Sequence, residues 1–334
     1  MAAEPQIIWL QDCAGDCAPL VGSKAHGLGT LLREGFRVPP GFAITTDAYR
    51  EHVAHNNLRA VLSADRSAED IRQAFEHSRP SPQLSEAVLA AHEQLGGSAQ
   101  PVAVRSSATA EDLANASFAG QQETYLWLLG GEQVLQHVLR CWGSLFTEQA
   151  VAYRQHLGVP FEDLAMAVVV QQMVPAEVAG VMLTIDPISG DRSTITIEAA
   201  YGLGAAVVNG EVTPDRFVVD KTTLEIRERA LGDKHMAYRF DPSIAGTRFL
   251  PVLPARQRQA CMSDEEVRAL AQLGKRMEQA MGDRPQDLEW AIGPTREIFL
   301  LQARPETVWS QMPSGPAVEP TRGQATELGS RGSA

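Results

Sequence analysis

The stretch DLEWAIGPTREIFLLQAR, residues 287–304, holds two runs of alternating apolar and polar side chains on either side of the turn sequence Gly-Pro-Thr-Arg. Such a pattern predicts an antiparallel β-hairpin. The expected cross-strand pairs are Ile292 with Glu297, Trp290 with Phe299, Leu288 with Leu301 and Asp287 with Gln302. Because successive side chains of a strand point to opposite faces, one face should form an apolar core. Its expected members are Leu288, Trp290, Phe299 and Leu301.

The other face of this hairpin is expected to carry four polar side chains: Asp287, Glu289, Gln302 and Arg304. Two carboxylates two residues apart can share a hard cation such as Mg²⁺, which would in turn bridge phosphate oxygens. An arginine on the neighbouring strand can bind a phosphate directly. Taken alone, the pattern leaves open a solvated sheet face with a cross-strand ion pair.

Two further segments are candidate anion-binding sites. Val21-Gly22-Ser23-Lys24 places a glycine and a lysine at the start of a predicted helix, where backbone amides and an ammonium group suit a phosphate. Arg105 ends the predicted strand PVAVR and precedes the small residues Ser106-Ser107-Ala108-Thr109, which leave room around its guanidinium. A solvated lysine and a surface arginine are the alternatives.

Composition excludes several classes of function. The 334 residues are 44% apolar and 21% charged, as in an ordinary globular enzyme. With 29 Lys and Arg against 41 Asp and Glu, the net charge of −12 disfavours binding to nucleic acid. No apolar run is long enough for a bilayer, and no secretory signal is recognisable, so we expect no membrane partner and a cytoplasmic protein. Four cysteines are too few for a disulfide framework.

The order of the patterns predicts an α/β chain of several parts. Expected helices cover residues 23–34, 132–157 and 263–280, the last opened by a capping box at Ser263. Residues 164–170 read as a buried strand, and 180–185 with 194–197 as a hairpin. The expected division is a mainly helical subdomain at 1–100, a central sheet-containing nucleotide-binding subdomain at 101–220, a C-terminal subdomain with the hairpin at 221–310 and a disordered tail at 311–334.

Five ordered motifs resemble a known family. They are VGSKAHGLGTLLREGFRVPPGFAITTDAY, VAVRSSATAEDLANASFAGQQETYL, QQMVPAEVAGVMLTIDP, YGLGAAVVNGEVTPDRF and DLEWAI followed by IFLLQARPETV. In this order they are similar to the N-terminal nucleotide-binding domain of phosphoenolpyruvate synthase and pyruvate, phosphate dikinase, a domain also present in rifampicin phosphotransferase. The resemblance covers about residues 7–310.

The resemblance implies an ATP-grasp-like fold, with Mg²⁺ and ATP between two lobes and the β-phosphate passed to a histidine on a swivelling domain. By position, it implies phosphate contacts and a catalytic role for Lys24, Arg105 and Arg304, metal binding by Asp287, Glu289 and Gln302, and phosphate contacts by Gln302 as well. It also implies a phosphate-covering loop with Gly120 and Thr124, and adenine contacts from the backbone of Gln172, Met173 and Val174.

The sequence departs from the family pattern in two respects. Ser23 and His26 stand where the family usually has Gly and often Asn. No Gly-rich loop bearing an acceptor histidine and no C-terminal pyruvate-binding barrel is recognisable. We therefore expect an ATP-dependent phosphotransferase subunit that works with a separate phosphohistidine protein and an acceptor-binding subunit, as in phenylphosphate synthase. The final acceptor could be phenol or pyruvate. The alternatives are a non-catalytic nucleotide-binding module and a fragment of an antibiotic phosphotransferase.

Overall fold

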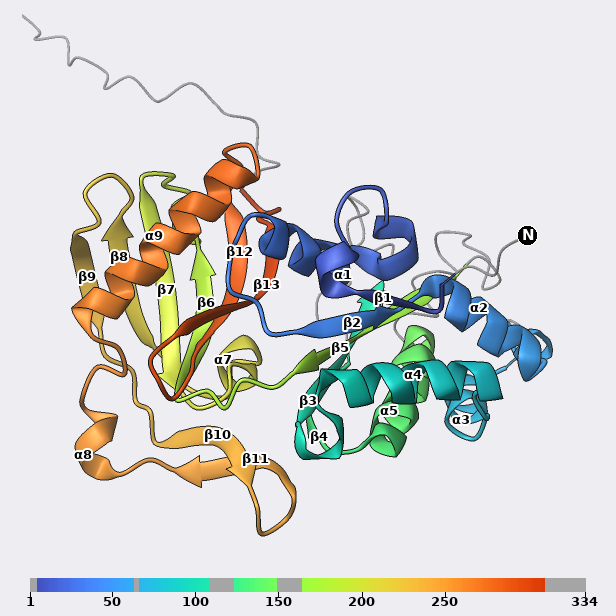
Figure 1. Ribbon diagram of the computed structural model, residues 1–334. Helices are drawn as coiled ribbons and strands as arrows, with labels where there is room; N and C mark the ends of the chain where they lie inside the picture. Colours follow the sequence, from blue (N-terminus) through green and yellow to red (C-terminus); the bar gives the residue numbers. More distant parts are fainter. Residues whose placement is uncertain (1–4, 63–65, 109–122, 149–163, 310–334) are drawn as a thin grey trace, which may run out of the picture.

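The computed structural model describes residues 5–62, 66–108, 123–148 and 164–309. Its strands form three sheets, in which all paired neighbours are antiparallel (Figure 1). The five-stranded sheet contains, in spatial order, β1 (Ile7–Trp9), β2 (Gly41–Ile44), β5 (Met166–Gln172), β3 (Val102–Ala108) and β4 (Thr124–Leu128). The six-stranded sheet contains β13 (Ile298–Pro305), β12 (Gln286–Ile292), β6 (Val178–Leu183), β7 (Thr194–Tyr201), β8 (Asp215–Asp220) and β9 (Ile226–Ala230). The strands β10 (Met236–Asp241) and β11 (Gly246–Pro251) form a separate hairpin.

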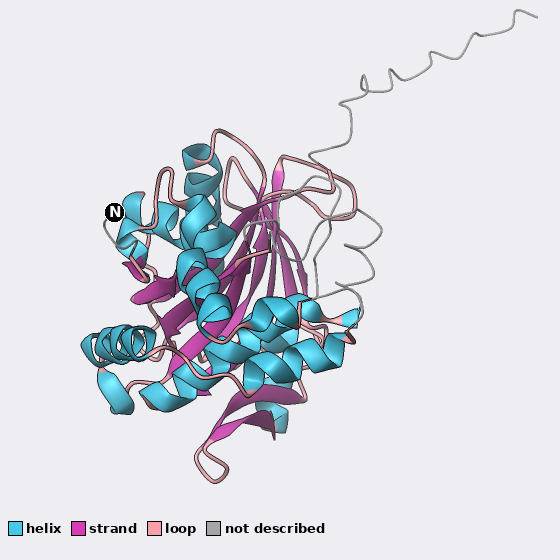
Figure 2. Cartoon of the chain, turned by 90° about the vertical axis from the view of Figure 1, so that its right-hand side faces the viewer, coloured by secondary structure: helices cyan, strands magenta, loops and turns pink. Residues whose placement is uncertain are grey.

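The helices cover these sheets and bury the two main cores. They are α1 (Ala18–Arg33), α2 (Thr46–His55), α3 (Ala68–Glu76), α4 (Pro82–Leu95), α5 (Gly131–Gly143), α7 (Ala205–Val208), α8 (Pro254–Gln257) and α9 (Asp264–Ala280). Short 3₁₀ turns cover Leu10–Asp12, Leu58–Ala60, Gly97–Ala99 and Ser144–Phe146. One core lies between the six-stranded sheet, α9 and α1, and the other between the five-stranded sheet and α2–α5. Seen from the α2–α5 side, helices lie in front of the strands (Figure 2).

The α/β class predicted from the sequence is confirmed by these helices and sheets. Strands between residues 7 and 172 build the five-stranded sheet, and strands between 178 and 305, apart from β10 and β11, build the six-stranded sheet. The polypeptide therefore forms two sheet-centred lobes, as expected for an ATP-grasp-like arrangement. The expected boundaries at residues 100 and 220 stay a prediction, and the expected tail at 311–334 lies outside the described residues.

Local sequence patterns predicted the positions of several helices and strands correctly. Ser263 and Glu266 form the predicted capping box, and α9 ends at Ala280 as expected. The predicted hairpin around the turn at 186–191 is present as β6 and β7. The predicted helix at 132–157 is wrong in extent, because α5 ends at Gly143. A 3₁₀ turn follows it and Thr147 is extended, so the helical path stops there. Residues 149–163 lie outside the described chain.

The predicted pairing of the C-terminal hairpin is wrong by one residue near its turn and by two beyond a bulge. Ile292 pairs with Ile298 and Trp290 with Leu300, because the turn contains five residues instead of four. A register shift between Glu289 and Trp290 then makes room for an additional residue, Leu301. The actual pairs beyond the bulge are Glu289 with Gln302, Leu288 with Ala303 and Asp287 with Arg304.

This change of register moves two side chains of the predicted core to the other face. Leu288, Trp290 and Leu300 are buried in the main core, whereas Phe299 and Leu301 belong to a smaller apolar cluster. The four polar residues remain together on one face, because beyond the bulge the register differs from the expected one by two residues, and side chains two residues apart point to the same face. Among the described residues, no helix is both long and apolar enough to cross a membrane.

The core of the helical side contains a buried histidine. His52 is 1% exposed and its ring packs against Phe75 and Trp142. Its Nε2 lies 2.8 Å from the hydroxyl of Ser78. Burial, with a smaller contribution from His55, lowers the pKa of His52 from 6.5 to about 4. The folded protein therefore holds this imidazole neutral at pH values where an unfolded chain would protonate it.

Acidification is expected to destabilise the protein through His52. The unfolded chain takes up this proton below pH 6.5 and the folded chain only near 4. The free energy of unfolding should thus fall as the pH drops between these values, by up to about 3 kcal/mol. Denaturant unfolding at about pH 7 and about pH 4.5 measures the effect. His52→Gln should reduce the difference by about 2 kcal/mol or more, whereas His77→Gln, at an exposed position, should retain it. An undiminished difference in the His52 variant would contradict the prediction.

Candidate active site

Arg105 connects the two large sheets at the point where they meet. Its Nη1 donates to the carbonyl oxygen of Leu301 at 2.9 Å. Its Nη2 donates to Glu289 Oε2 at 2.9 Å and to Gln302 Oε1 at 2.7 Å. The Arg105 side chain is only 9% exposed. Its Nε is buried and has no acceptor in the described chain, which makes it a donor directed at this junction without a protein partner.

The loop that carries Lys24 is held against the same strand. Lys24 is 6% exposed, and its Nζ donates to the carbonyl oxygen of Ser106 at 2.8 Å. Helix α1 is kinked at Gly22, whose φ is 74°. A Cβ atom at Gly22 would lie 2.1 Å from the carbonyl oxygen of Ser107. Only glycine combines this conformation with such a close approach, so Gly22 lets the loop pack on β3, where the ammonium group of Lys24 reaches the backbone of the residue after Arg105.

The hydroxyl of Ser107 fixes the loop from the other side. It donates to Val21 O at 2.8 Å and accepts from Ala25 N at 3.3 Å. Helix α1 also packs on β13, since a Cβ atom at Gly27 would lie 3.0 Å from Ala303 O. The helix that carries Lys24 therefore lies between the strand of Arg105 and the strand of Arg304.

Asp287 and Arg304 face each other at the end of the C-terminal hairpin. Arg304 donates to Asp287 Oδ2 from Nε at 2.9 Å and from Nη2 at 2.7 Å. The arginine side chain is 57% exposed and the aspartate side chain 22%. Glu289 follows two residues along β12 on the same face. Of the residues for which sequence analysis predicted contacts with phosphate or metal, the structure joins Arg105 to Glu289 and Gln302 and pairs Arg304 with Asp287 on the same hairpin. It bonds Lys24 to the backbone of Ser106, the residue after Arg105.

The oxygen atoms of this group suit a magnesium ion. Within the described chain, the hydrogen bonds of Asp287 and Glu289 engage Oδ2 and Oε2, which leaves Oδ1 and Oε1 for a cation. Gln302 adds an amide oxygen next to Glu289. No cluster of three or more His, Cys, Asp or Glu side chains is found among the described residues. Mg²⁺ commonly uses one or two carboxylates together with substrate phosphates and water, so this donor set fits Mg²⁺ bound with a nucleotide.

Thr124 lies directly beside Arg105 on the neighbouring strand. The two residues are cross-strand partners in the pairing of β3 with β4, and Thr124 is exposed. Gly120, which sequence analysis placed in the same phosphate-covering loop, lies outside the described residues.

An apolar cluster extends from the polar group between the lobes. Its buried members are Val174, Ala176, Ala179, Leu203 and Ala291, and its half-buried members are Leu126, Trp127, Met173, Tyr238, Phe299 and Leu301. These residues come from both lobes and from β10. Among them, sequence analysis predicted ligand contacts only for Met173 and Val174, and it assigned Phe299 and Leu301 to the core of the hairpin. The others were missed because the cluster joins short segments that are far apart in the sequence.

The segment predicted to contact adenine has few backbone groups left for a ligand. Gln172 N donates to Pro40 O, and Met173 N donates to Pro101 O, both at 2.9 Å. The side chain of Gln172 donates to Leu95 O. Within the described chain, no hydrogen bond engages Met173 O or Val174 N. These two groups border the apolar cluster.

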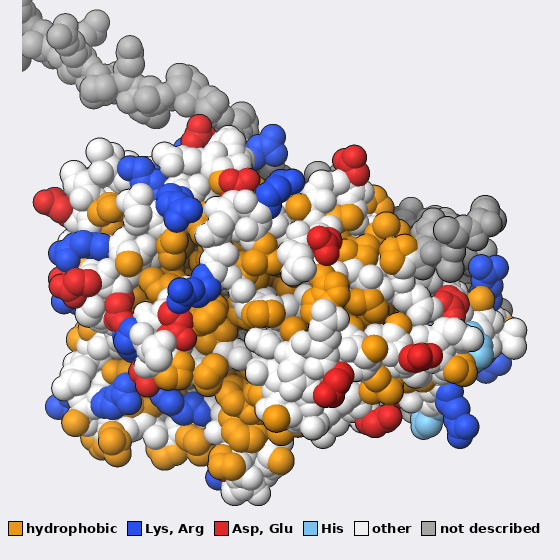
Figure 3. Space-filling view, viewed as in Figure 1, with side chains coloured by type: hydrophobic (Ala, Val, Ile, Leu, Met, Phe, Trp, Pro, Cys, Tyr) orange, Lys and Arg blue, Asp and Glu red, His pale blue; other side chains and the backbone are white. Residues whose placement is uncertain are grey.

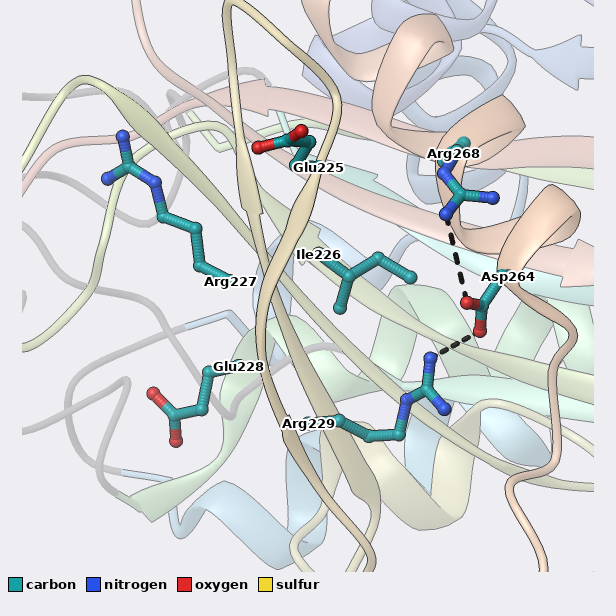
Figure 4. Close-up of a pocket in the computed structure, with 7 residues that line it drawn as sticks. All are labelled: Glu225, Ile226, Arg227, Glu228, Arg229, Asp264 and Arg268. Carbon is teal, nitrogen blue, oxygen red and sulfur yellow. Dashed lines mark hydrogen bonds and ion pairs between the residues drawn. The ribbon is translucent and has the colours of Figure 1, made fainter.

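A separate open hollow lies far from this group, on the opposite edge of the six-stranded sheet (Figure 4). Its lining combines β9 and the start of α9. Asp264 pairs there with Arg229 and Arg268, and Arg227 pairs with Asp220. Because these charges are satisfied by one another on an edge strand, they protect the edge from pairing with other chains and do not form a candidate active site.

Comparison with known proteins identifies the family. The profile described as "Pyruvate phosphate dikinase, AMP/ATP-binding domain" matches residues 18–324. The chain therefore belongs to this family, as the sequence motifs predicted.

The chain is similar to parts of longer enzymes. It is 39% identical over 368 residues to a phosphoenolpyruvate synthase of Aeropyrum pernix, with 97% of this chain and 45% of the relative covered. It is 40% identical over 324 residues to a rifampicin phosphotransferase of Streptomyces sviceus, with 93% and 37% covered. The chain thus spans less than half the length of these relatives.

Solved structures show only a low likeness. D-alanyl-alanine synthetase A from Vibrio cholerae has a TM-score of 0.32 at 9% identity, with 82% of this chain and 52% of that chain covered. A D-cycloserine synthetase has a TM-score of 0.31 at 14% identity, with 83% and 59% covered. At these TM-scores the likeness carries no weight for the chemistry of this chain.

Proposed function

We propose that this protein binds Mg-ATP between its two sheets and uses it to phosphorylate a histidine carried by a separate domain or protein. The observation that carries the proposal is the contact of Arg105 in the five-stranded sheet with Glu289 and Gln302 in the six-stranded sheet, with Lys24 bonded to the carbonyl oxygen of Ser106, the residue after Arg105. The site has three cationic side chains and two carboxylates, which suit a polyphosphate that binds together with a divalent cation. The cations are Lys24, Arg105 and Arg304, and the carboxylates are Asp287 and Glu289. Membership of an AMP/ATP-binding family supports the same ligand.

The residues would act mainly by positioning and by electrostatics, which dominate phosphoryl transfer. Lys24 and Arg105 would bind phosphate oxygens, with Arg105 oriented by Glu289 and Gln302. Asp287 and Glu289 would hold Mg²⁺, which when bound neutralises charge on the triphosphate. Arg304, more than half exposed at the hairpin end, would contact the phosphates nearest to the acceptor. Thr124, the first residue of β4 and the cross-strand partner of Arg105, would lie close to them.

The apolar cluster would bind the adenine base of ATP. Its half-buried side chains, among them Trp127, Tyr238 and Phe299, offer an apolar surface next to the polar group. Met173 O and Val174 N would supply the hydrogen bonds to adenine, because the amides of Gln172 and Met173 are already used within the fold.

The overall reaction would convert ATP, water and a histidine into AMP, phosphate and phosphohistidine. The acceptor histidine and the site of the final acceptor would lie in parts that the longer relatives possess beyond the matched region. A split enzyme that finally phosphorylates pyruvate or phenol is our first choice. The similarity to a rifampicin phosphotransferase, 40% identical, supports an antibiotic acceptor as the second candidate.

Nucleotide binding by the chain itself tests the core of the proposal. Titration calorimetry with ATP should reveal one saturable site that requires Mg²⁺. Lys24→Met should weaken this binding by about 10- to 100-fold, since a charge-assisted hydrogen bond contributes about 1.5–3 kcal/mol. Lys275→Met on α9, away from the site, is the matched control and should bind normally.

Transfer is tested by supplying a histidine-bearing domain from a relative together with ATP labelled at the β-phosphate. The label should appear on the added domain, and AMP should accumulate. A chain that binds Mg-ATP and releases no AMP with any such domain would be a nucleotide-binding module, and a chain that binds no ATP would refute the proposal altogether.

A further inference from the structure

The segment 231–258, which contains the β10–β11 hairpin and α8, exposes several large apolar side chains. It is called the hairpin unit here. Several of the exposed large apolar side chains of the described chain lie on it. They are Leu231, Met236, Ile244 and Leu253, with exposed fractions of 49%, 37%, 54% and 70%. Exposed apolar residues are ordinary one by one, but a concentration of them on one small element is typical of an interaction surface.

The hairpin unit also has a positive net charge, opposite in sign to that of the whole chain. It contains five Lys and Arg against two Asp, whereas the whole chain has 29 basic and 41 acidic residues. Lys234 is buried and pairs with Asp215, and Arg248 pairs with Asp241. Within the described residues, no carboxylate lies within ion-pair distance of the other three arginines: Arg239, Arg256 and Arg258.

Two of these arginines are held close to each other. The guanidinium of Arg256 lies 4.5 Å from the ring centroid of Tyr201, and the hydroxyl of Tyr201 donates to Arg256 O at 3.2 Å. Arg239 lies opposite Arg248 in the β10–β11 ladder. Burial and the positive charge of Arg256 lower the pKa of Arg239, and the carboxylate of Glu177 offsets only part of this effect. Like charges in such positions repel one another, and an external carboxylate would relieve this repulsion.

The hairpin unit is accessible to another molecule. The β10–β11 pair is joined to the rest of the strands by one parallel bridge, between Gly202 and Tyr238, and projects from the lower side of the protein (Figure 1). Lysine and arginine atoms gather with apolar atoms at the lower left of the surface, over α8 and β10 (Figure 3). Arginine together with large apolar side chains is the composition found in the centres of protein interfaces.

We propose that the hairpin unit is a docking surface for an acidic protein surface with an apolar centre. Charge complementarity selects this partner, because three arginines of the unit have no ion-pair partner among the described residues. A second copy of the chain fits less well, since a symmetric contact would set one arginine group against another. A free small anion would leave the exposed apolar side chains uncovered.

The position of the hairpin unit suits a partner that stays bound during turnover. Leu203 N donates to Tyr238 O, Gly202 N to Glu177 O, and Glu177 N to Ile292 O, which places the unit beside the Ile292 end of β12. Asp287 lies at the other end of that strand, roughly 17 Å away at about 3.4 Å per residue. A partner docked on the hairpin unit would leave the Asp287–Arg304 end open.

A defined peptide tests the proposal without knowledge of the partner. A fluorescent peptide of alternating Glu and Leu is titrated with the protein, and a peptide of alternating Lys and Leu serves as the charge control. A chain of net charge −12 should repel the acidic peptide unless a local cationic surface binds it. We expect saturable binding of the acidic peptide that weakens with added salt, and weaker binding of the basic one.

Charge reversal locates the binding. Arg256→Glu combined with Arg258→Glu, both at exposed positions, should weaken acidic-peptide binding at least tenfold and leave Mg-ATP binding unchanged. Arg59→Glu combined with Arg79→Glu, at exposed positions of the helical lobe, is the matched control and should bind normally. Absence of binding, equal binding of both peptides or equal weakening in the control would overturn the proposal. Self-association of the native chain that the first variant abolishes would assign the surface to a second copy and overturn it too.

Discussion

Replacing Asp215 with alanine is expected to lower the free energy of unfolding by about 3–5 kcal/mol. Asp215 and Lys234 form an ion pair whose side chains are both 0% exposed. Asp215 also accepts from Gly232 N at 2.9 Å and from Cys261 N at 2.8 Å. The substitution would leave the buried ammonium group of Lys234 with only the carbonyl oxygen of Gly232 as acceptor, and would deprive the buried amide of Cys261 and the half-buried amide of Gly232 of theirs. A buried charge without its counter-charge is costly.

Denaturant unfolding with a matched set of variants measures this effect. Asp233→Ala removes an exposed carboxylate whose partner, His235, is also exposed, and should cost less than about 1 kcal/mol. Asp215→Leu combined with Lys234→Met removes both buried charges and should recover a large part of the loss. A loss below about 1 kcal/mol in Asp215→Ala would mean that Lys234 finds another acceptor or water.

This buried pair is a feature that sequence analysis did not predict. Asp215 lies in the motif VTPDRF, and Lys234 follows a loop 19 residues later. Nothing in the local pattern indicates that both charges enter the core, because their burial depends on how β8, the loop at Gly232 and the segment before α9 pack together. By contrast, the capping box at Ser263 is a local signal, and it predicted the start of α9 correctly.

The C-terminal hairpin shows where pattern reasoning succeeds and fails. Alternation predicted that Asp287, Glu289, Gln302 and Arg304 share a face, and the structure agrees. The register was wrong, because alternation does not encode the number of turn residues or the bulge that contains Leu301. That Arg105 and Glu289, 184 residues apart, would belong to one site was expected only from the family resemblance, and the direct hydrogen bond between them was not predicted. The apolar cluster escaped prediction for the same reason of sequence distance.

Replacing Arg105 with lysine is expected to reduce histidine phosphorylation by about 100-fold or more. A lysine retains the charge but has all its donors on one nitrogen, so it lacks the rigid fork in which Nη1 reaches Leu301 O while Nη2 reaches Glu289 and Gln302. The carboxylate of Glu289 would then lose the donor that fixes its orientation. The position of the bound metal and the phosphates would become less well defined, although the net charge of the site would not change.

The assay follows AMP release and transfer of the β-phosphate label, with the affinity for Mg-ATP measured in parallel. Arg216→Lys is the matched control, because Arg216 also bridges two carboxylates, Asp186 and Glu228, at another place on the six-stranded sheet. If the Arg105 variant lost affinity for Mg-ATP and kept its maximal rate, Arg105 would serve binding alone. If both stayed within about threefold of the native values, the bridge between the sheets would be structural and the phosphate contact would be refuted. A fall in the maximal rate larger than the fall in affinity is the expected result, because the guanidinium fork would orient the phosphates most strongly as the bond to the acceptor forms.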